Sequence, residues 1–591
     1  MSEVELEAAA PAGARKWLAL AVLALGLSMV VLDGTIVAVS LPVIIADLHL
    51  NFTQAQWITS VYAVVLAALL ITGGRLGDRL GRRRLFALGV VVFVAGSLLA
   101  AAATSAGPLI WGRIVQGVGA AAVLPGTLAT MNAIFRGRDR VIAFAVWGSV
   151  ISGVAAIGPL LGGWLTTSYT WPWIFLVNIP FGAVVLAGLL LFVPETRMGK
   201  AAPGLDVDGF LLSAAGFALV VFALIEGQSY GWWQPLRDFP LLGFTWSGDA
   251  PISPVPVLLA LGVLALVLFV RWERHRILIG RSALLDPALF RIPSFRWGNV
   301  AAFAVALGEF GLLFVLPLFM VNVLGLSTLQ AGYVLAGMAA GAFLAAGIAE
   351  GLVRKYGPVR VVQLGLALEA VAVAATALFV TPDISPWWLA GMLAVYGIGL
   401  GMASAQLTGT VLGEVPPEDS GQGSATQSTV RQVGSAFGTA VVGGLLSVAL
   451  GHDLAERLAA VPDLPEEAAD TIATATRESA GGAIAGVREH EGVTAVLDAL
   501  LHGFTDATRT TLLAAAIFLL LGLAAATLIP HRTPARKQRG TEKDADPPNR
   551  AAPGGVAETS GGTTASGAAD AAGGAPEGEA DASGGAPEGG G

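Results

Sequence analysis

Long apolar runs alternate with short polar connections along most of this 591-residue chain. A helix of about 20 apolar residues can cross the hydrocarbon core of a bilayer with its backbone hydrogen bonds closed internally. Fourteen such runs are present, which predicts an all-α integral membrane protein with fourteen transmembrane helices. Their approximate cores are 17–45, 57–74, 85–104, 109–134, 141–167, 172–193, 209–225, 254–270, 297–321, 331–350, 361–380, 387–412, 430–450 and 512–529.

Positive charge is distributed unevenly among the connections. With the N-terminus inside, the connections after runs two, four, six, eight and ten carry 19 Lys and Arg residues together. The outer connections as far as the eleventh run carry one, Arg237. Because basic residues are retained on the cytoplasmic side, we expect a multi-pass protein of the cell membrane with both termini in the cytoplasm.

The runs and connections predict five regions. Residues 531–591 are rich in Gly, Ala, Asp and Glu and cannot bury a core, so we expect a disordered cytoplasmic tail. The apolar spacing in 453–461 and 493–504 predicts amphipathic helices outside the membrane. The regions are a cytoplasmic N-terminal segment (1–16), a six-helix bundle (17–193), two extra helices with linkers (194–296), a second six-helix bundle with a long outer loop at 451–509 (297–530), and the tail (531–591).

Composition supports the membrane interpretation and narrows the chemistry. The chain is 55% hydrophobic and 13% charged, with a mean hydropathy of +0.72, far from the soluble range. It has no cysteine, and its six histidines lie outside the apolar runs, so we expect neither a metal site nor a cofactor. Residues 541–591 hold nine acidic and two basic residues and so supply −7 of the net charge of −8, and we expect no nucleic-acid partner.

One predicted cytoplasmic connection, "GGRLGDRLGRRRLF" (73–86), contains an acid and several glycines besides the basic residues that determine membrane orientation. Its arginines set orientation, whereas the acid and the glycines suggest a releasable contact between helices. We expect this clasp to involve Gly74, Asp78, Arg79, Gly81 and Arg82. A weaker copy, "EGLVRKYGPVR" (350–360), follows the tenth run. Two parallel repeats are a design of secondary transporters.

Six motifs in this order resemble those of a known family: "LDGTIVAVSLP" (32–42), the loop above, "LIWGRIVQGVGAA" (109–121), "GVAAIGPLLGGWL" (153–165), "WPWIFLVNIP" (171–180) and "EDSGQGSATQSTVRQVGSAFG" (418–438). The chain resembles the major facilitator superfamily, specifically its fourteen-span drug:proton antiporters. It departs from the family pattern at Ala38, where Asn is expected, and at Pro172, where Arg is usual.

The resemblance implies two six-helix pseudo-repeat bundles plus two extra central helices. It also implies proton-coupled efflux of bulky hydrophobic or amphiphilic, often cationic, drugs across the cell membrane by alternating access. The expected partners are a drug-like small molecule, protons and the lipid bilayer, with the protein a monomer.

Charged residues inside the apolar runs are candidates for proton coupling. Asp33 is the only acid within the first six runs, and Arg113 is the only basic residue in their interior. An intramembrane charge is costly, so such residues are functional candidates by default; the alternative is a structural ion pair. Glu309 is a third candidate, in a run that the family arrangement places at the cavity. For Glu369 a packing or lipid-boundary role is favoured.

Two further sets of residues are candidates. In the fifth run, Pro159 permits a bend, and glycines allow a close helix contact that would seal the closed state; the alternative is ordinary small-residue packing. The gating set is Gly153, Gly158, Pro159, Gly162 and Gly163. At the thirteenth run, Gln427 and Arg431 are interpreted as cavity polar groups or as ligands of the last carbonyls of a neighbouring helix.

Three other functions are weighed against multidrug efflux. A dedicated exporter of one endogenous metabolite or antibiotic, conferring self-resistance, would show the same features. A membrane enzyme should gather catalytic side chains in a loop, and the long loop at 451–509 has no such constellation. A sensor should carry a folded soluble domain. We therefore expect a transporter and not an enzyme.

Overall fold

The computed structural model describes residues 13–135, 137–196, 206–241, 244–416, 420–490 and 493–530. The side chains of Asp78 and of most residues between 137 and 153 lie outside this description. Most of the predicted N-terminal segment and almost all of the predicted tail are also outside it.

The six predicted runs of the first bundle each form a helix, and the sixth is divided into two pieces by a break at Val177. Pro42 lies inside α1, Pro125 inside α4 and Pro159 inside α5. The helices are α1 (Ala14–Leu48), α2 (Phe52–Leu80), α3 (Arg82–Ala101), α4 (Ala106–Ile134), α5 (Gly137–Ser168), α6 (Trp173–Leu176) and α7 (Asn178–Phe192).

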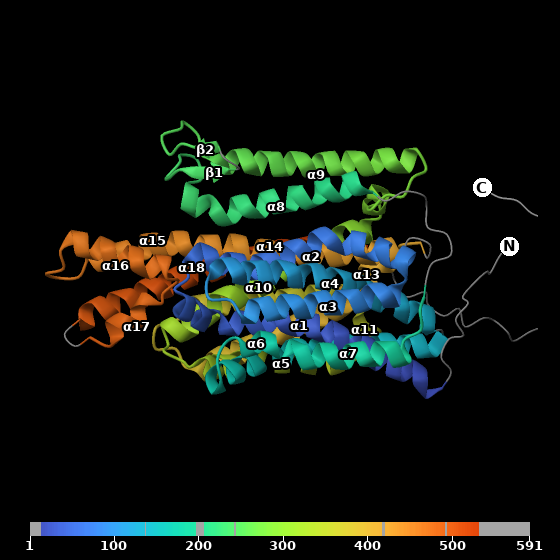
Figure 1. Ribbon diagram of the computed structural model, residues 1–591. Coiled ribbons are helices and arrows are strands. Elements are labelled where there is room, and N and C mark those ends of the chain that lie inside the picture. Colours follow the sequence, from blue (N-terminus) through green and yellow to red (C-terminus); the bar gives the residue numbers. More distant parts are fainter. Residues whose placement is uncertain are drawn as a thin grey trace, which may run out of the picture. The chain divides into compact units, whose positions relative to one another are not determined.

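The two extra helices, α8 (Val207–Tyr230) and α9 (Pro254–Leu278), pack against each other. They are central in the sequence but lie along one edge of the bundle, where α8 contacts α2 (Figure 1). A short antiparallel hairpin, β1 (Phe239–Leu241) and β2 (Phe244–Trp246), joins them. The sequence analysis did not predict this hairpin. A 3₁₀ turn, η1 (Pro287–Arg291), follows α9.

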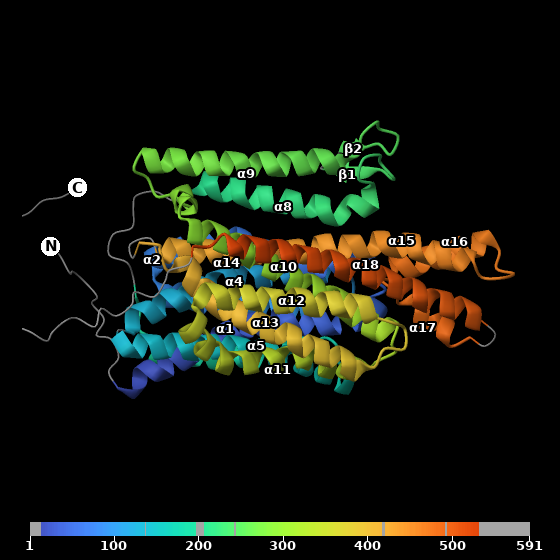
Figure 2. The same ribbon diagram turned by 180° about the vertical axis from the view of Figure 1, so that it is seen from behind.

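One end of the second bundle projects past the ends of the other helices (Figure 2). The segments predicted as separate amphipathic helices extend two membrane helices, α15 and α18. The elements are α10 (Pro293–Asn322), α11 (Thr328–Tyr356), α12 (Pro358–Phe379), α13 (Pro386–Leu412), α14 (Ser420–Phe437), a π-helical turn η3 (Gly438–Val442), α15 (Gly443–Ala459), α16 (Glu466–Glu478), α17 (Ala483–Arg488) and α18 (Thr494–Thr527).

Thirteen helices are long and apolar enough to cross a membrane, counted over the described residues alone. They cover thirteen of the fourteen predicted runs. The remaining run, 141–167, lies within the 32-residue helix α5, where many side chains are outside the description. The all-α membrane architecture is therefore confirmed.

The two halves repeat the same local geometry. Gly81 separates α2 from α3 with φ 106°, and Gly357 separates α11 from α12 with φ 85°. Glycine adopts these positive φ values without the steric cost that other residues incur. The two loop copies thus form equivalent turns between consecutive helices.

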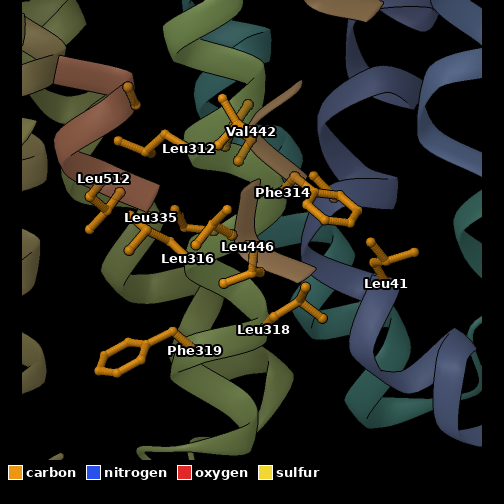
Figure 3. Close-up of a cluster of buried hydrophobic side chains, with 14 of the residues drawn as sticks. Leu41, Leu312, Phe314, Leu316, Leu318, Phe319, Leu335, Val442, Leu446 and Leu512 are labelled. Carbon is orange, nitrogen blue, oxygen red and sulfur yellow. The ribbon is translucent and has the colours of Figure 1, made fainter. Parts of the chain in front are cut away.

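The hydrophobic core differs between the two ends of the bundle. We call the end with the turns at 49–51, 169–172 and 323–327 the predicted outer end, and the opposite end the predicted inner end. At the predicted outer end one core combines both bundles, with Leu41 of α1 near Phe314 and Leu318 of α10 (Figure 3). A separate core at the inner end includes Leu20, Phe86 and other residues of the first bundle alone. The halves are thus joined at the outer end.

Candidate functional site

A buried ion pair lies at the centre of the first bundle. The side chains of Asp33 on α1 and Arg113 on α4 are 0% and 1% exposed, and Arg113 Nη1 contacts Asp33 Oδ2. Arg113 Nε also donates to the carbonyl oxygen of Ile58 at 3.2 Å. The guanidinium lies 4.4 Å from the ring centroid of Tyr62, within the range of a cation–π interaction. The two charges that the sequence singled out are therefore in direct contact.

Three neutral side chains complete this site, and the sequence analysis missed them. Gln116 Nε2 donates to Asp33 Oδ1 at 2.7 Å and to Ser97 Oγ at 2.8 Å. Asn178 Nδ2 lies 3.2 Å from each of the same two oxygens. Gln116 follows Arg113 by three residues, a spacing that puts both on one helix face. That spacing was the available signal for Gln116.

The bonding of Asp33 determines what this site can do. A buried charge is strongly destabilising once its partner leaves, whereas a fully bonded pair is tolerated. Asp33 accepts from Arg113, Gln116 and Asn178, so its carboxylate is well satisfied in this conformation. Protonation of Asp33 would remove the negative charge and release Arg113. This cluster is hence suited to switching between two bonding arrangements.

The second bundle carries a different polar arrangement. Glu309 Oε2 on α10 lies 3.4 Å from Arg431 Nη2 on α14. The Glu309 side chain is 8% exposed, whereas that of Arg431 is 44% exposed. Gln427 Nε2 donates to Thr408 Oγ1 at 3.2 Å. Arg431 thus pairs with a carboxylate and Gln427 with a hydroxyl in this structure, rather than with helix-terminal carbonyls.

Glu369 on α12 is fully buried, which agrees with the packing role expected for it and not with the alternative, a place at the lipid boundary. Neither of its carboxylate oxygens has a hydrogen-bond partner among the described residues. The same is true of the buried hydroxyl group of Tyr396 on α13. Exposed residues of α12, such as Val371 and Leu378, cover the opposite helix face. The helix is peripheral, but its acid points inward.

The predicted gating motif of α5 lies between two helices. A Cβ atom at Gly162 would lie 2.8 Å from the carbonyl oxygen of Ile36 on α1. Gly158 is in close contact with the side chain of Thr35, also on α1. A Cβ at Gly163 would lie 2.7 Å from the carbonyl oxygen of Thr328 on α11.

The contact with α11 is close from both sides. A Cβ at Gly332 of α11 would lie 2.7 Å from the carbonyl oxygen of Pro159. This is a backbone-to-backbone contact between the two bundles, near the predicted outer end. The surroundings of Gly153 are not part of the description.

The predicted clasp is only partly described, because the side chain of Asp78 is outside the description. Gly74 lies beside Pro125, and a Cβ at Gly81 would lie 2.6 Å from Glu195 Oε1. Glu195 also accepts a hydrogen bond from the backbone N–H of Arg83 at 3.1 Å, in the first turn of α3.

Glu195 was not among the residues predicted from the sequence. The backbone N–H of Arg82 donates to the carbonyl oxygen of Thr196 at 3.1 Å, and Arg79 and Arg82 take part in further interactions. The segment after α7 therefore anchors this loop within the first bundle.

Further contacts join the bundles at the predicted outer end. Gln56 Nε2 on α2 lies 3.3 Å from the carbonyl oxygens of both Thr439 and Ala440 in the π-helical turn. The rings of Phe52 and Phe314 meet at 5.8 Å in an edge-to-face arrangement. A π-helical turn frees backbone carbonyls from the regular helical pattern. Gln56 satisfies two of them from the opposite bundle.

Two pseudo-repeat bundles, each with buried charged residues and joined at one end, are the architecture of a secondary transporter. The chain matches the Major Facilitator Superfamily over residues 23–439. It therefore belongs to the Major Facilitator Superfamily.

Individual relatives agree with this assignment. The chain is 32% identical over 554 residues to the puromycin resistance protein pur8 of Streptomyces alboniger, covering 92% of this chain and 97% of that protein. It is 30% identical over 513 residues to the multidrug efflux pump LfrA of Mycolicibacterium smegmatis, covering 86% and 95%. A crystal structure of a bacterial homologue of the human lysosomal transporter Spinster shares the fold, with a TM-score of 0.54, 17% identity and coverage of 88% and 97%.

Proposed function

We propose that this protein exports bulky hydrophobic or amphiphilic, often cationic, compounds across the cell membrane in exchange for protons. The observation that carries this proposal is the buried Asp33–Arg113 pair with its ring of neutral donors. A carrier that exchanges protons for substrate needs a group that binds a proton on one side and releases it on the other. Asp33 meets this need because Arg113 balances its charge whenever it is ionised.

The structure corresponds to one state of an alternating-access cycle. Contacts between the bundles at the predicted outer end hold that end shut, while the inner end of the first bundle has a core of its own. The distribution of Lys and Arg supports cytoplasmic termini, and with the outer end joined we infer that this conformation faces the cytoplasm. It is the state that loads substrate from the cell. Protons, lipid and a monomeric protein complete the proposed assembly.

The relatives support export and leave substrate breadth open. LfrA is named a multidrug efflux pump, whereas pur8 is named for resistance to one antibiotic. A dedicated exporter of one endogenous compound, giving self-resistance, is therefore the second candidate function. A screen with many compounds separates the two, because a dedicated exporter should move one chemical family alone.

The decisive experiment uses purified protein in vesicles with an imposed pH gradient. Dyes, quaternary ammonium compounds and antibiotics are tested for movement against their own gradients. We expect Asp33→Asn, which keeps the shape but cannot ionise, to insert normally and to lose gradient-driven transport. Binding of neutral substrates should persist. Wild-type transport that ignores the pH gradient would contradict proton coupling, and a coupled Asp33→Asn variant would move the coupling site elsewhere.

A further inference from the structure

A glycine contact between α3 and α4 recurs between α12 and α13. In the first bundle, a Cβ at Gly89 would lie 2.8 Å from the Gly119 carbonyl oxygen, and one at Gly119 would lie 2.5 Å from the Phe93 nitrogen. In the second bundle, a Cβ at Gly365 would lie 2.6 Å from the Gly399 carbonyl oxygen. One at Gly399 would lie 2.8 Å from the Glu369 nitrogen. The two helix pairs therefore pack in the same register.

This register places Glu369 and Tyr396 at defined positions of the repeat. Glu369 follows Gly365 by four residues, as Phe93 follows Gly89. Tyr396 precedes Gly399 by three residues, as Gln116 precedes Gly119. In the first bundle the residue at this position of the fourth helix, Gln116, binds the coupling carboxylate. Tyr396 thus occupies the position in the second bundle that corresponds to Gln116, which donates a hydrogen bond to Asp33 in the first.

The polar groups at these positions lack partners in the present conformation. Both oxygens of Glu369 and the hydroxyl of Tyr396 are buried without a hydrogen bond among the described residues. An unpaired carboxylate is much more costly to bury than a neutral carboxyl group. Glu369 is therefore held here as the neutral acid, with its proton bound.

The charged neighbours of Glu369 can change this state. Glu309 on α10 and Arg431 on α14 act electrostatically on Glu369, and Tyr396 lies on α13, which packs directly against α12. On the packed neighbour α18 the nearest charge is Arg509, which donates to Ala377 and Val380 near the outer end of α12. The charged residues of α11, namely Glu350, Arg354 and Lys355, are exposed at its opposite end. The Glu309–Arg431 pair is thus the charge arrangement able to act on Glu369.

We propose that Glu369 is a second proton-carrying residue, whose proton leaves when a cationic substrate displaces Arg431 from Glu309. This inference rests on the proposed export function. Before binding, Glu309 and Arg431 neutralise each other and Glu369 is protonated. After binding, the cation neutralises Glu309, and Arg431 neutralises the Glu369 carboxylate. The O–H bond of Glu369 breaks and its proton passes to water, so one cation enters the site as one proton leaves.

Tyr396 has a positioning role in this exchange. Its O–H can donate to the Glu369 carboxylate once that group ionises, as Gln116 donates to Asp33. Without this donor the carboxylate would be less stabilised. Tyr396→Phe should therefore require a higher pH for the same proton release, while Glu369→Asp should retain release because it keeps a carboxyl group.

The test measures protons released when tetraphenylphosphonium binds to the purified full-length protein in weakly buffered detergent solution. We expect Glu369→Gln to bind the cation and to release about one proton fewer per bound cation than wild type, by proton linkage. Asp383→Asn is the matched control, because this exposed acid lies in the turn between α12, which carries Glu369, and α13, which carries Tyr396. It should release as many protons as wild type.

The outcomes separate the two proposals. A wild-type protein that binds the cation without releasing protons would contradict the proposed proton-coupled function. Wild-type release that is unchanged in Glu369→Gln would overturn the role of Glu369 alone. If Glu369→Gln fails to fold, the Tyr396→Phe variant decides: a pH profile of release identical to that of wild type would also overturn the inference.

Discussion

The contact between α5 and α11 gives a direct test of the alternating-access interpretation. Gly332 has no room for a side chain, because a Cβ there would lie 2.7 Å from the carbonyl oxygen of Pro159. An ordinary van der Waals contact begins at 3.4 Å, so Gly332→Ala requires the two helices to separate by about 0.7 Å. The three atoms nearest to this Cβ all belong to the backbone of Pro159 and Leu160, which limits local relaxation. The added methyl group therefore opposes closure of the outer end.

The expected magnitude follows from this geometry. Overpacking of a tight contact costs about 1–3 kcal/mol. The contact joins the two bundles, so the cost applies only in the conformation in which the outer end is closed. A differential of that size shifts a two-state equilibrium by about 5- to 150-fold. We expect Gly332→Ala to favour the outward-open state by a factor in this range.

Because the chain contains no cysteine, a single introduced cysteine is the only thiol that a labelling reagent can modify. Thr328 lies in the same contact and is 6% exposed, so a single Thr328→Cys substitution reports opening through its rate of labelling by an impermeant thiol reagent. Gly347→Ala on the same helix is the matched control, because nothing lies within 4 Å of a Cβ built there. Labelling should accelerate in Gly332→Ala and stay constant in Gly347→Ala. Equal rates in both variants would refute the interpretation of this contact as a closing surface.

Three further predictions use independent features. Gln56→Leu removes the two bonds to the π-helical turn, so thiol labelling at position 328 should rise by about fivefold for a loss near 1 kcal/mol; an unchanged rate would contradict this role. Glu195→Ala removes an acceptor from the first turn of α3 and should destabilise the protein by about 0.5–2 kcal/mol in thermal unfolding, as loss of a helix cap does; an unchanged Tm would contradict it. Deletion of 541–591 should leave transport intact, because its composition cannot form a core; loss of transport at normal abundance would show a missed role.

The sequence predicted most of the fold because hydrophobic length is a strong local signal. A described helix corresponds to each of the fourteen apolar runs. The weak sequence repeat around Gly357 forms the same kind of turn between helices as the loop around Gly81. The short hairpin and the way the helices pack against one another were harder to predict from the sequence. The hairpin of β1 and β2 is three residues per strand, too short for a clear alternating pattern. The edge position of α8 and α9 depends on packing, which apolar periodicity cannot specify.

The candidate site shows the same division. Asp33 and Arg113 were identifiable because charges are rare in apolar runs, and the structure brings them together. Gln116 and Asn178 were missed because a neutral amide carries no charge and therefore gives a weaker signal than Asp33 or Arg113. The inward orientation of Glu369 was also missed. Its helix is peripheral, and the rotation of that helix about its axis is set by the glycine contact with α13.

The two polar clusters differ in a way that bears on the mechanism. Asp33 accepts hydrogen bonds from Arg113, Gln116 and Asn178 in this conformation. Glu369 has no such donors among the described residues, and Arg431 remains partly exposed beside Glu309. An approaching cation therefore meets an accessible ion pair in the second bundle and a closed one in the first. Under the proposed function, this asymmetry favours substrate recognition by the second bundle, and proton uptake by Asp33 would require a rearrangement that releases Arg113.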